Sequence, residues 1–302
     1  VERHDHRFDW LGVALSAVGL TAIVFGIQEG ESYDWAPWVW LLVAGGVLVM
    51  GLFVLWQART RTEPLVPLSL FRDRNFTLSN IGIAAMGFAV TGMMIPLMFY
   101  LQLVGGMSPT QAALIMVPMA LLTGIGAPIV GRILDHVHPS LIICTGLAGY
   151  AVATAWAGTI FTPSTPVWQL ILPTLLMGVS SAGIWAPLAA TATRNLPWQA
   201  AGAGAGVYNT TRVVGSVVGT SAIGALMLNR LAAQGLTFEF SEGTEVSRLP
   251  EPIRPGFATA MGESLYLAAA ALVVGVVATF FLVRPAHQGQ STAVPVDEAR
   301  VP

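Results

Sequence analysis

Apolar residues gather into eight long stretches, and polar residues lie mainly in the short segments between them. The stretches cover about residues 10–28, 38–56, 77–103, 111–134, 141–161, 168–190, 203–228 and 257–283. Most of them reach the roughly 20 residues that a helix needs to cross the hydrocarbon core of a bilayer. No segment shows the alternation over about ten residues that a membrane-spanning strand requires. The pattern therefore predicts an all-α membrane protein with eight transmembrane helices.

Composition supports this prediction. Of the 302 residues, 54% are hydrophobic and only 10% are charged, whereas soluble domains carry about 25% charged residues. Such a chain has too few charges to cover a water-exposed surface, so a lipid bilayer is its expected surrounding. The net charge of −2 gives no reason to expect a nucleic-acid partner. The single cysteine, Cys144, lies in an apolar stretch, which excludes a disulfide framework.

The polar segments divide the chain into five regions. We expect a cytoplasmic linker over 1–9, a transmembrane hairpin over 10–58, an amphipathic cytoplasmic loop over 59–76, a six-helix bundle over 77–284 and a disordered cytoplasmic tail over 285–302. In the loop, Leu65, Leu68 and Phe71 are expected to lie along the membrane surface. The chain opens with a charged segment instead of a Met or a signal peptide. We therefore expect that the beginning of the protein is missing.

Arginine is distributed unevenly between the two sets of connecting segments. All 14 basic residues are arginine, and ten of them flank one side of the spans: Arg3, Arg7, Arg59, Arg61, Arg72, Arg74, Arg132, Arg194, Arg284 and Arg300. The other side carries three, all at or within the segment 229–256. The positive-inside rule places the arginine-rich side, with both ends of this chain, in the cytoplasm. The absence of lysine and the abundance of Ala, Gly and Pro indicate a GC-rich bacterial genome, so the membrane that we expect is a bacterial plasma membrane.

Proline separates the spans into two kinds. Pro96, Pro118, Pro128, Pro173 and Pro187 lie inside three of the last six stretches, whereas the stretches 10–28, 38–56, 141–161 and 257–283 contain none. Broken backbone is tolerated at membrane depth where neighbouring helices or a water-filled cavity satisfy it. The distribution favours these three spans as working helices, although any one proline can mark a simple kink.

One charged side chain interrupts an apolar span. Arg212 lies near the middle of the stretch 203–228, where inserting a charge costs roughly 2.5–3.5 kcal/mol. On a helix, a sector of about 120° holds the arginine together with small and polar neighbours, namely Tyr208, Asn209, Gly215, Ser216 and Gly219. Gly215 and Gly219 have the spacing that lets a second helix approach closely. We therefore expect Arg212 to face protein or a water-filled cavity.

Two roles are open for Arg212. It can lie on the pathway of a substrate or proton, because charges inside membranes are commonly functional, with Asn209 and Tyr208 beside it. It can also lock two helices together through its five N–H donors. No Asp or Glu occupies the middle of a span, since Asp135 lies at a cytoplasmic end and Glu263 near an outer end. A carboxylate for proton chemistry is therefore expected outside this chain.

A second candidate face lies in the stretch 77–103. Met86, Met93 and Tyr100 recur every seven residues and so share one side of a helix. Methionine is adaptable and recurs at promiscuous binding surfaces, which favours a substrate cavity, but packing against another helix accounts for the pattern at least as well. Just beyond, Ser108 and Gln111 are typical of a capping box at a helix start.

The sequence offers little for catalysis or metal binding. No set of nucleophile, histidine and acid lies at membrane depth, and no phosphate-binding glycine loop follows a strand. His136 and His138 lie two residues apart in a short turn with one nearby acid, which makes a poor metal site. We therefore expect no enzyme, no metal and no cofactor.

Four stretches give the chain a family resemblance. They are FDWLGVALSAVGLTAIVFGIQEG, YLQLVGGMSPTQAALIMVP, GRILDHVHPSL and GAGAGVYNTTRVVGSVVG, in this order from about residue 8 to 284. In sequence and spacing they resemble the major facilitator superfamily, and more narrowly the C-terminal part of its fourteen-helix drug:proton antiporter branch. The resemblance implies that the first two spans are a hairpin inserted between two six-helix halves. It also implies that the N-terminal half is missing here.

The resemblance also assigns roles to individual positions. It implies that 77–103, 111–134, 168–190 and 203–228 line a central cavity, and that Gly131 and Asp135 belong to a cytoplasmic gate. Asn209 and Arg212 match the family's Asn-x-x-Arg pattern. The sequence departs from the gate pattern at His138, where glycine is usual, and at Pro139 and Ser140, which replace basic residues.

Two hypotheses follow. In the first, the chain is part of a secondary transporter that exports small hydrophobic or cationic compounds, with the proton gradient as its energy source and two halves rocking around a site at the membrane midplane. In the second, it is a truncated or accessory membrane module that does not transport by itself. Six further apolar spans in the upstream reading frame favour the first, and a start codon just before Val1 favours the second.

Overall fold

The computed structural model describes residues 9–30, 32–60, 64–134, 136–236 and 249–283. Within these residues every regular element is a helix. Eight helical units are long and apolar enough to cross a bilayer: Trp10–Glu29, Pro37–Arg59, Arg74–Val104, Pro109–Leu134, Pro139–Ile160, Val167–Thr193, Gln199–Ala233 and Glu251–Phe280. The all-α membrane fold with eight spans is thus confirmed.

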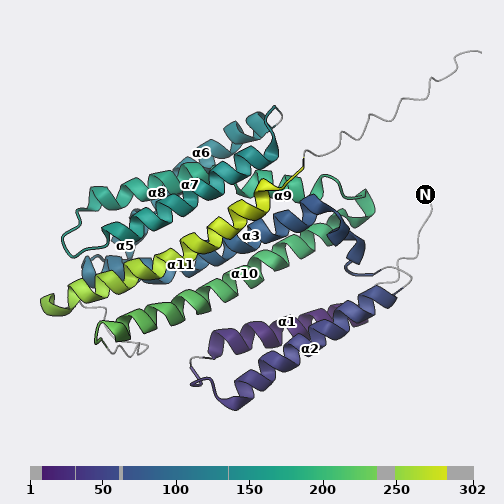
Figure 1. Ribbon diagram of the computed structural model, residues 1–302, viewed down its shortest axis with the longest axis horizontal. Helices are drawn as coiled ribbons and strands as arrows, with labels where there is room; N and C mark the ends of the chain where they lie inside the picture. Colours follow the sequence, from purple (N-terminus) through teal and green to yellow (C-terminus); the bar gives the residue numbers. More distant parts are fainter. Residues whose placement is uncertain (1–8, 31, 61–63, 135, 237–248, 284–302) are drawn as a thin grey trace, which may run out of the picture.

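The first two spans form a separate hairpin. Helices α1 (Trp10–Glu29) and α2 (Pro37–Arg59) pack against each other, and Figure 1 shows them set apart from the remaining helices. The two backbones cross closely, because a Cβ added at Gly46 would lie 2.9 Å from the carbonyl oxygen of Gly19. The ends of the helices at this turn, with the connections 105–108, 161–166 and 234–236, define what we call the hairpin-turn end of the molecule.

The other six spans form one bundle. Its elements are α3 (Arg74–Gly92), α4 (Met94–Phe99), the π-helix η2 (Tyr100–Val104), α5 (Pro109–Leu114), α6 (Val117–Leu134), α7 (Pro139–Ile160), α8 (Val167–Ala182), α9 (Trp185–Thr193), α10 (Trp198–Ala233) and α11 (Arg254–Phe280). Helix α3 packs along α10 and α11, and α7 packs along α11 and α8 (Figure 1). Helix α6 packs mainly on α8 and contributes no buried residue.

Three of the five internal prolines coincide with breaks in the helices. A proline removes the hydrogen bond to the carbonyl four residues earlier and its ring clashes with that group. Accordingly, α3 ends at Gly92 before Pro96, α5 ends at Leu114 before Pro118, and α8 ends at Ala182, next to Gly183 and before Pro187. Pro128 and Pro173 lie inside continuous helices. Each of the three proline-containing spans therefore has one break.

Some boundaries differ from those expected. Helix α3 begins at Arg74, inside the segment predicted to be a loop, because Asp73 caps it: the backbone N–H of Phe76 donates to Asp73 Oδ1 at 2.7 Å. The preceding segment forms the 3₁₀ turn η1 (Leu68–Arg72), in which Leu70 is buried and Phe71 is exposed. At the other end of the chain α10 begins at Trp198 and α11 ends at Phe280. The capping box of Ser108 and Gln111 is confirmed.

A polar clasp closes the hairpin at the end opposite its turn. Asp9 caps α1 by accepting from the backbone N–H of Gly12 at 2.8 Å, and it also accepts from Trp56 Nε1 at 3.0 Å and Gln57 Nε2 at 2.8 Å. The side-chain carbonyl of Gln57 accepts in turn from the backbone N–H of Val66 at 3.2 Å. This Asp9 clasp therefore joins both helices of the hairpin to the segment that leads into the bundle.

Candidate functional site

The polar cluster predicted around Arg212 lies in the first half of α10, the longest helix described. Tyr208 is buried, Asn209 is exposed and Arg212 is half-buried. Tyr208 lies one helical turn before Arg212. Among the described residues no carboxylate pairs with the Arg212 guanidinium. The structure thus places a permanent charge in mid-helix without an acidic partner in the part of the chain it describes.

A close contact between α3 and α10 fixes the orientation of this cluster. A Cβ added at Gly215 or Gly219 would overlap the backbone of α3 at Ala84 or Phe88, and one added at Gly87 would overlap the carbonyl of Arg212. We call this contact the glycine seam. Because the seam lies along the side of α10 that holds Gly215 and Gly219, Arg212 lies at its edge. The backbone carbonyl of Arg212 contributes to the seam, while the residue as a whole is half-buried.

Beyond the seam, one stripe of α10 is only partly covered. Steps of three or four residues, which keep to one side of a helix, join Asn209 to Val213, Ser216, Thr220 and Gly224. Asn209 and Val213 are exposed and the other three are half-buried. We call these five residues the Asn209 stripe. The described helices leave this stripe partly open, and they also leave α6 without a buried residue.

The methionine row has different surroundings. Met86 and Met93 are fully buried, and Tyr100 is 2% exposed. The Tyr150 hydroxyl donates to Met93 Sδ at 3.9 Å. The Tyr100 hydroxyl donates to the carbonyl of Thr162 at 2.8 Å, and its ring stacks on Phe161. These are the contacts of helix packing within the six-helix bundle, and contact with a substrate stays a prediction.

The two residues of the predicted gate are not brought together by described contacts. Gly131 is exposed near the end of α6, and a Cβ added there would meet no heavy atom within 4 Å. Asp135 lies outside the described residues. The gate therefore stays a prediction.

The sequence analysis did not single out two buried polar residues of α3, Ser79 and Asn80. Among the described residues, three buried side-chain atoms have no hydrogen-bond partner: Ser79 Oγ, Asn80 Oδ1 and the Tyr208 hydroxyl. Buried polar atoms are nearly always paired, which sets these three apart. Asn80 lies one turn beyond Phe76, which is next to Gly204, so it is level with Tyr208. The polar pair Ser79-Asn80 within an apolar stretch is the signal that could have found them.

The fold defines a class of protein: it is a multi-pass helical membrane protein, and one of its apolar helices carries a charged side chain, Arg212. The family model of the Major Facilitator Superfamily matches residues 4–220. The chain belongs to the Major Facilitator Superfamily.

Several relatives of this chain are named as transporters or export proteins. The chain is 46% identical over 286 residues to the uncharacterised MFS-type transporter Rv1250 of Mycobacterium tuberculosis, covering 93% of this chain and 49% of the relative. It is 27% identical to the tetracenomycin C resistance and export protein of Streptomyces glaucescens, covering 76% of this chain and 43% of the relative. It is also 27% identical to the multidrug export protein EmrB of Escherichia coli, covering 74% of this chain and 44% of the relative. The chain thus spans about half the length of these curated relatives.

A solved structure supports the fold alone. The bacterial homologue of the human lysosomal transporter Spinster, in an inward-facing and unoccupied conformation, matches with a TM-score of 0.51. The match is 16% identical in sequence and covers 89% of this chain and 67% of that chain.

Proposed function

We propose that this chain is the C-terminal portion of a secondary active transporter that exports small hydrophobic or cationic compounds in exchange for protons. Membership of the superfamily and the export names of several relatives support this proposal. The observation that carries it is the half-buried Arg212, which has no acidic partner among the described residues and borders the open Asn209 stripe. A second six-helix half is the expected partner on that surface, because superfamily sites lie between two halves.

The distribution of titratable groups supports different roles for the two halves, with a permanent charge in this half and the proton-binding carboxylate in the other. Arginine stays protonated in proteins, so Arg212 would hold an anion or a dipole and would not carry the proton. Glu263 of α11 is an acid inside a span of the bundle, and it lies toward the hairpin-turn end. Its Oε2 atom is 3.5 Å from Arg230 Nε. We infer that the carboxylate that binds the proton belongs to the other half. No cofactor is part of this proposal, because the proton gradient supplies the energy.

The proposed orientation has the hairpin-turn end outside a bacterial plasma membrane. The arginine count on the connecting segments supports this orientation. Both ends of this chain would then be cytoplasmic, and the cluster of Arg212 would lie about halfway across the bilayer.

The test is proton-coupled efflux from cells or vesicles. We expect the 302-residue chain alone to give no efflux and co-expression with a six-helix half from the same transporter to restore it. Efflux by the chain alone would contradict this and point to a homodimer. Lack of efflux with the matching half, while both are present in the membrane at normal yield, would favour a non-transporting module.

Arg212 variants in the same assay separate its two roles. Arg212→Lys keeps the charge but loses the planar fork, and we expect it to insert normally with most of the efflux lost. Arg212→Ala removes an insertion cost, so its yield and melting temperature should stay near normal while efflux fails. A loss of yield and melting temperature in Arg212→Ala would instead identify a structural lock. Normal efflux in a stable Arg212→Ala protein would remove Arg212 from the mechanism.

A further inference from the structure

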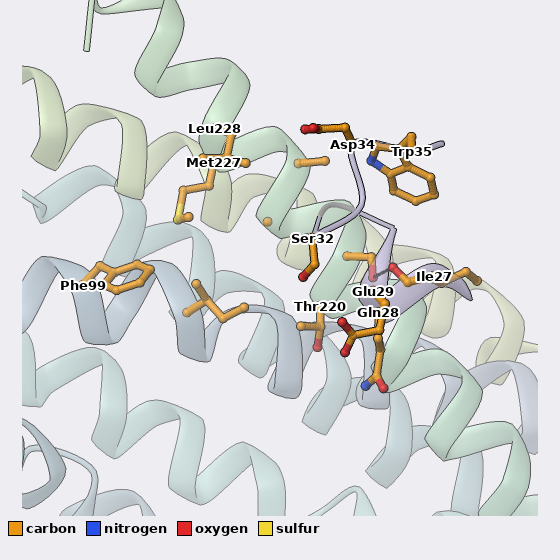
Figure 2. Close-up of a pocket in the computed structure, with 14 residues that line it drawn as sticks. Ile27, Gln28, Glu29, Ser32, Asp34, Trp35, Phe99, Thr220, Met227 and Leu228 are labelled. Atoms are coloured by element: carbon orange, nitrogen blue, oxygen red, sulfur yellow. Dashed lines mark hydrogen bonds between the residues drawn. The ribbon is translucent and has the colours of Figure 1, made fainter. Parts of the chain in front are cut away.

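A large cavity lies between the hairpin and the bundle at the hairpin-turn end. Its volume is about 990 Å³, which is at the upper end of the range for small-molecule sites, roughly 300–1,000 Å³. The end of α1 and the turn after it form one wall, and α10 and α4 form the other. Figure 2 shows Glu29, Ser32 and Asp34 on the hairpin side and Thr220, Met227 and Leu228 on the α10 side.

The hairpin wall is acidic. Glu29 and Asp34 line the cavity, and among the residues that the structure describes no arginine, lysine or histidine lines it. Among the described residues neither carboxylate forms an ion pair or a side-chain hydrogen bond. In Figure 2 the Asp34 carboxylate points toward α10, and both acids line the same space. The cavity therefore presents two negative charges that its own lining does not neutralise.

The opposite wall is mainly apolar. Phe99 and Ile95 of α4 and Met227 and Leu228 of α10 face the cavity. An aromatic ring and a flexible thioether suit organic bodies of different shapes. A wall of this kind facing two carboxylates is complementary to an amphiphilic organic cation, whose apolar part can contact α4 and α10 while its charge lies near the acids.

The cavity continues the Asn209 stripe. Thr220 and Gly224 belong to the stripe and line the cavity, and a Cβ added at Gly224 would meet no heavy atom within 4 Å. From Arg212 to Thr220 the helix rises by about 12 Å. The Ser221 hydroxyl donates to the carbonyl of Ile27 at 3.3 Å, which fixes the end of α1 against α10 beside the cavity. The cavity therefore lies on the same open side of α10 as the predicted central site.

We propose that the hairpin builds a second binding site, in which Glu29 and Asp34 hold the charge of an amphiphilic organic cation against Phe99, Met227 and Leu228. The site would hold a compound at the hairpin-turn end, between the central surface and the exterior. This proposal extends the proposed export function, but occupancy of the site needs neither the second half nor a proton gradient.

The test is equilibrium binding of labelled tetraphenylphosphonium to the purified 302-residue chain in phosphatidylcholine nanodiscs. We expect saturable binding that Glu29→Gln and Asp34→Asn each weaken about 3- to 5-fold, the range for partly exposed charges, and that the double variant weakens further. Gly224→Leu should also weaken binding by filling the cavity. Tetraphenylborate, which has the same shape and the opposite charge, should not compete.

Matched variants make the result specific. Glu251→Gln neutralises an exposed acid at the same end of the molecule but outside the cavity, and Gly206→Leu adds a side chain at another open glycine of α10. Both should bind as the unmodified chain does. Unchanged binding in the Glu29→Gln/Asp34→Asn double variant, or equal competition by tetraphenylborate, would overturn the proposal. Efflux by the combined halves without saturable probe binding would overturn this site alone, whereas binding without efflux would overturn only the export proposal.

Discussion

Asp9 shows how one carboxylate can hold three segments of a membrane protein together. Burial by itself would raise its pKa, but hydrogen bonds from Gly12, Gln57 and Trp56 outweigh that effect and lower the pKa of Asp9. A carboxyl whose pKa is lowered by folding stabilises the protein at pH values above its unfolded pKa, about 3.9. That contribution is lost as the pH falls through the lowered folded value.

We therefore expect Asp9→Asn to lower the melting temperature of the chain at pH 7, because the charged cap and its hydrogen bonds are weakened. The difference from the unmodified chain should shrink as the pH falls below the unfolded pKa of about 3.9 and approaches the lowered folded pKa of Asp9, because the advantage of the charged form is then lost. Thermal unfolding at pH 7, 5 and 3 measures it, with Asp34→Asn as the control at the exposed end of the same hairpin. A difference that does not change with pH would show that the charge of Asp9 is not what stabilises the clasp.

At the scale of the helices, the glycine seam predicts that glycine-to-alanine substitutions in α10 have different effects on stability, although helix propensity alone predicts the same effect for each. Alanine is favoured over glycine inside a helix by roughly 0.5–1 kcal/mol, so Gly206→Ala, where an added Cβ meets nothing within 4 Å, should be neutral or stabilising. At Gly219 the added Cβ overlaps the backbone of Phe88, and overpacking of this kind costs about 1–3 kcal/mol. Melting temperatures of the two variants test this; equal values would mean that α3 and α10 separate without cost.

The element scale also shows where sequence reasoning stops. The apolar stretches were enough to predict all eight spans, because length and hydropathy alone decide whether a helix can cross a bilayer. Proline positions predicted that three spans would be irregular, yet nothing in the sequence separates Pro96, which ends a helix, from Pro173, which does not. The direction of the methionine row was likewise open, since the side of a helix that holds Met86 and Met93 can face either a cavity or a neighbouring helix.

At the scale of the whole molecule, the orientation is the prediction most easily tested. In a Cys144→Ser background, we expect Ser32→Cys and Ser164→Cys to react with a membrane-impermeant maleimide added outside intact cells, because both lie exposed at the hairpin-turn end. Ser69→Cys, exposed at the opposite end, should react only after the membrane is opened. If Ser69→Cys reacts in intact cells while the other two variants do not, the chain has the opposite orientation. If all three react, the chain does not have a single orientation.

How well each candidate site could be predicted depended on how far apart its residues lie in the sequence. Tyr208, Asn209 and Arg212 lie within two turns of one helix, so their helical spacing alone predicted a shared region. The acidic cavity joins Glu29 to Thr220 and Met227, nearly two hundred residues away, and no pattern within a single segment carries that information. The two polar residues Ser79 and Asn80 became significant only when the packing of α3 showed that they lack partners.

The way in which the hairpin is attached has a consequence for how such a chain can change during evolution. Its described polar ties to the rest of the molecule are the Asp9 clasp, which reaches the adjoining segment, and the Ser221–Ile27 contact with α10. The six-helix bundle packs through contacts of its own, so a gene rearrangement that inserts or removes a two-helix unit here leaves most of that packing intact. Insertion of such a hairpin therefore adds the proposed binding wall while the helices of the bundle keep their sequence.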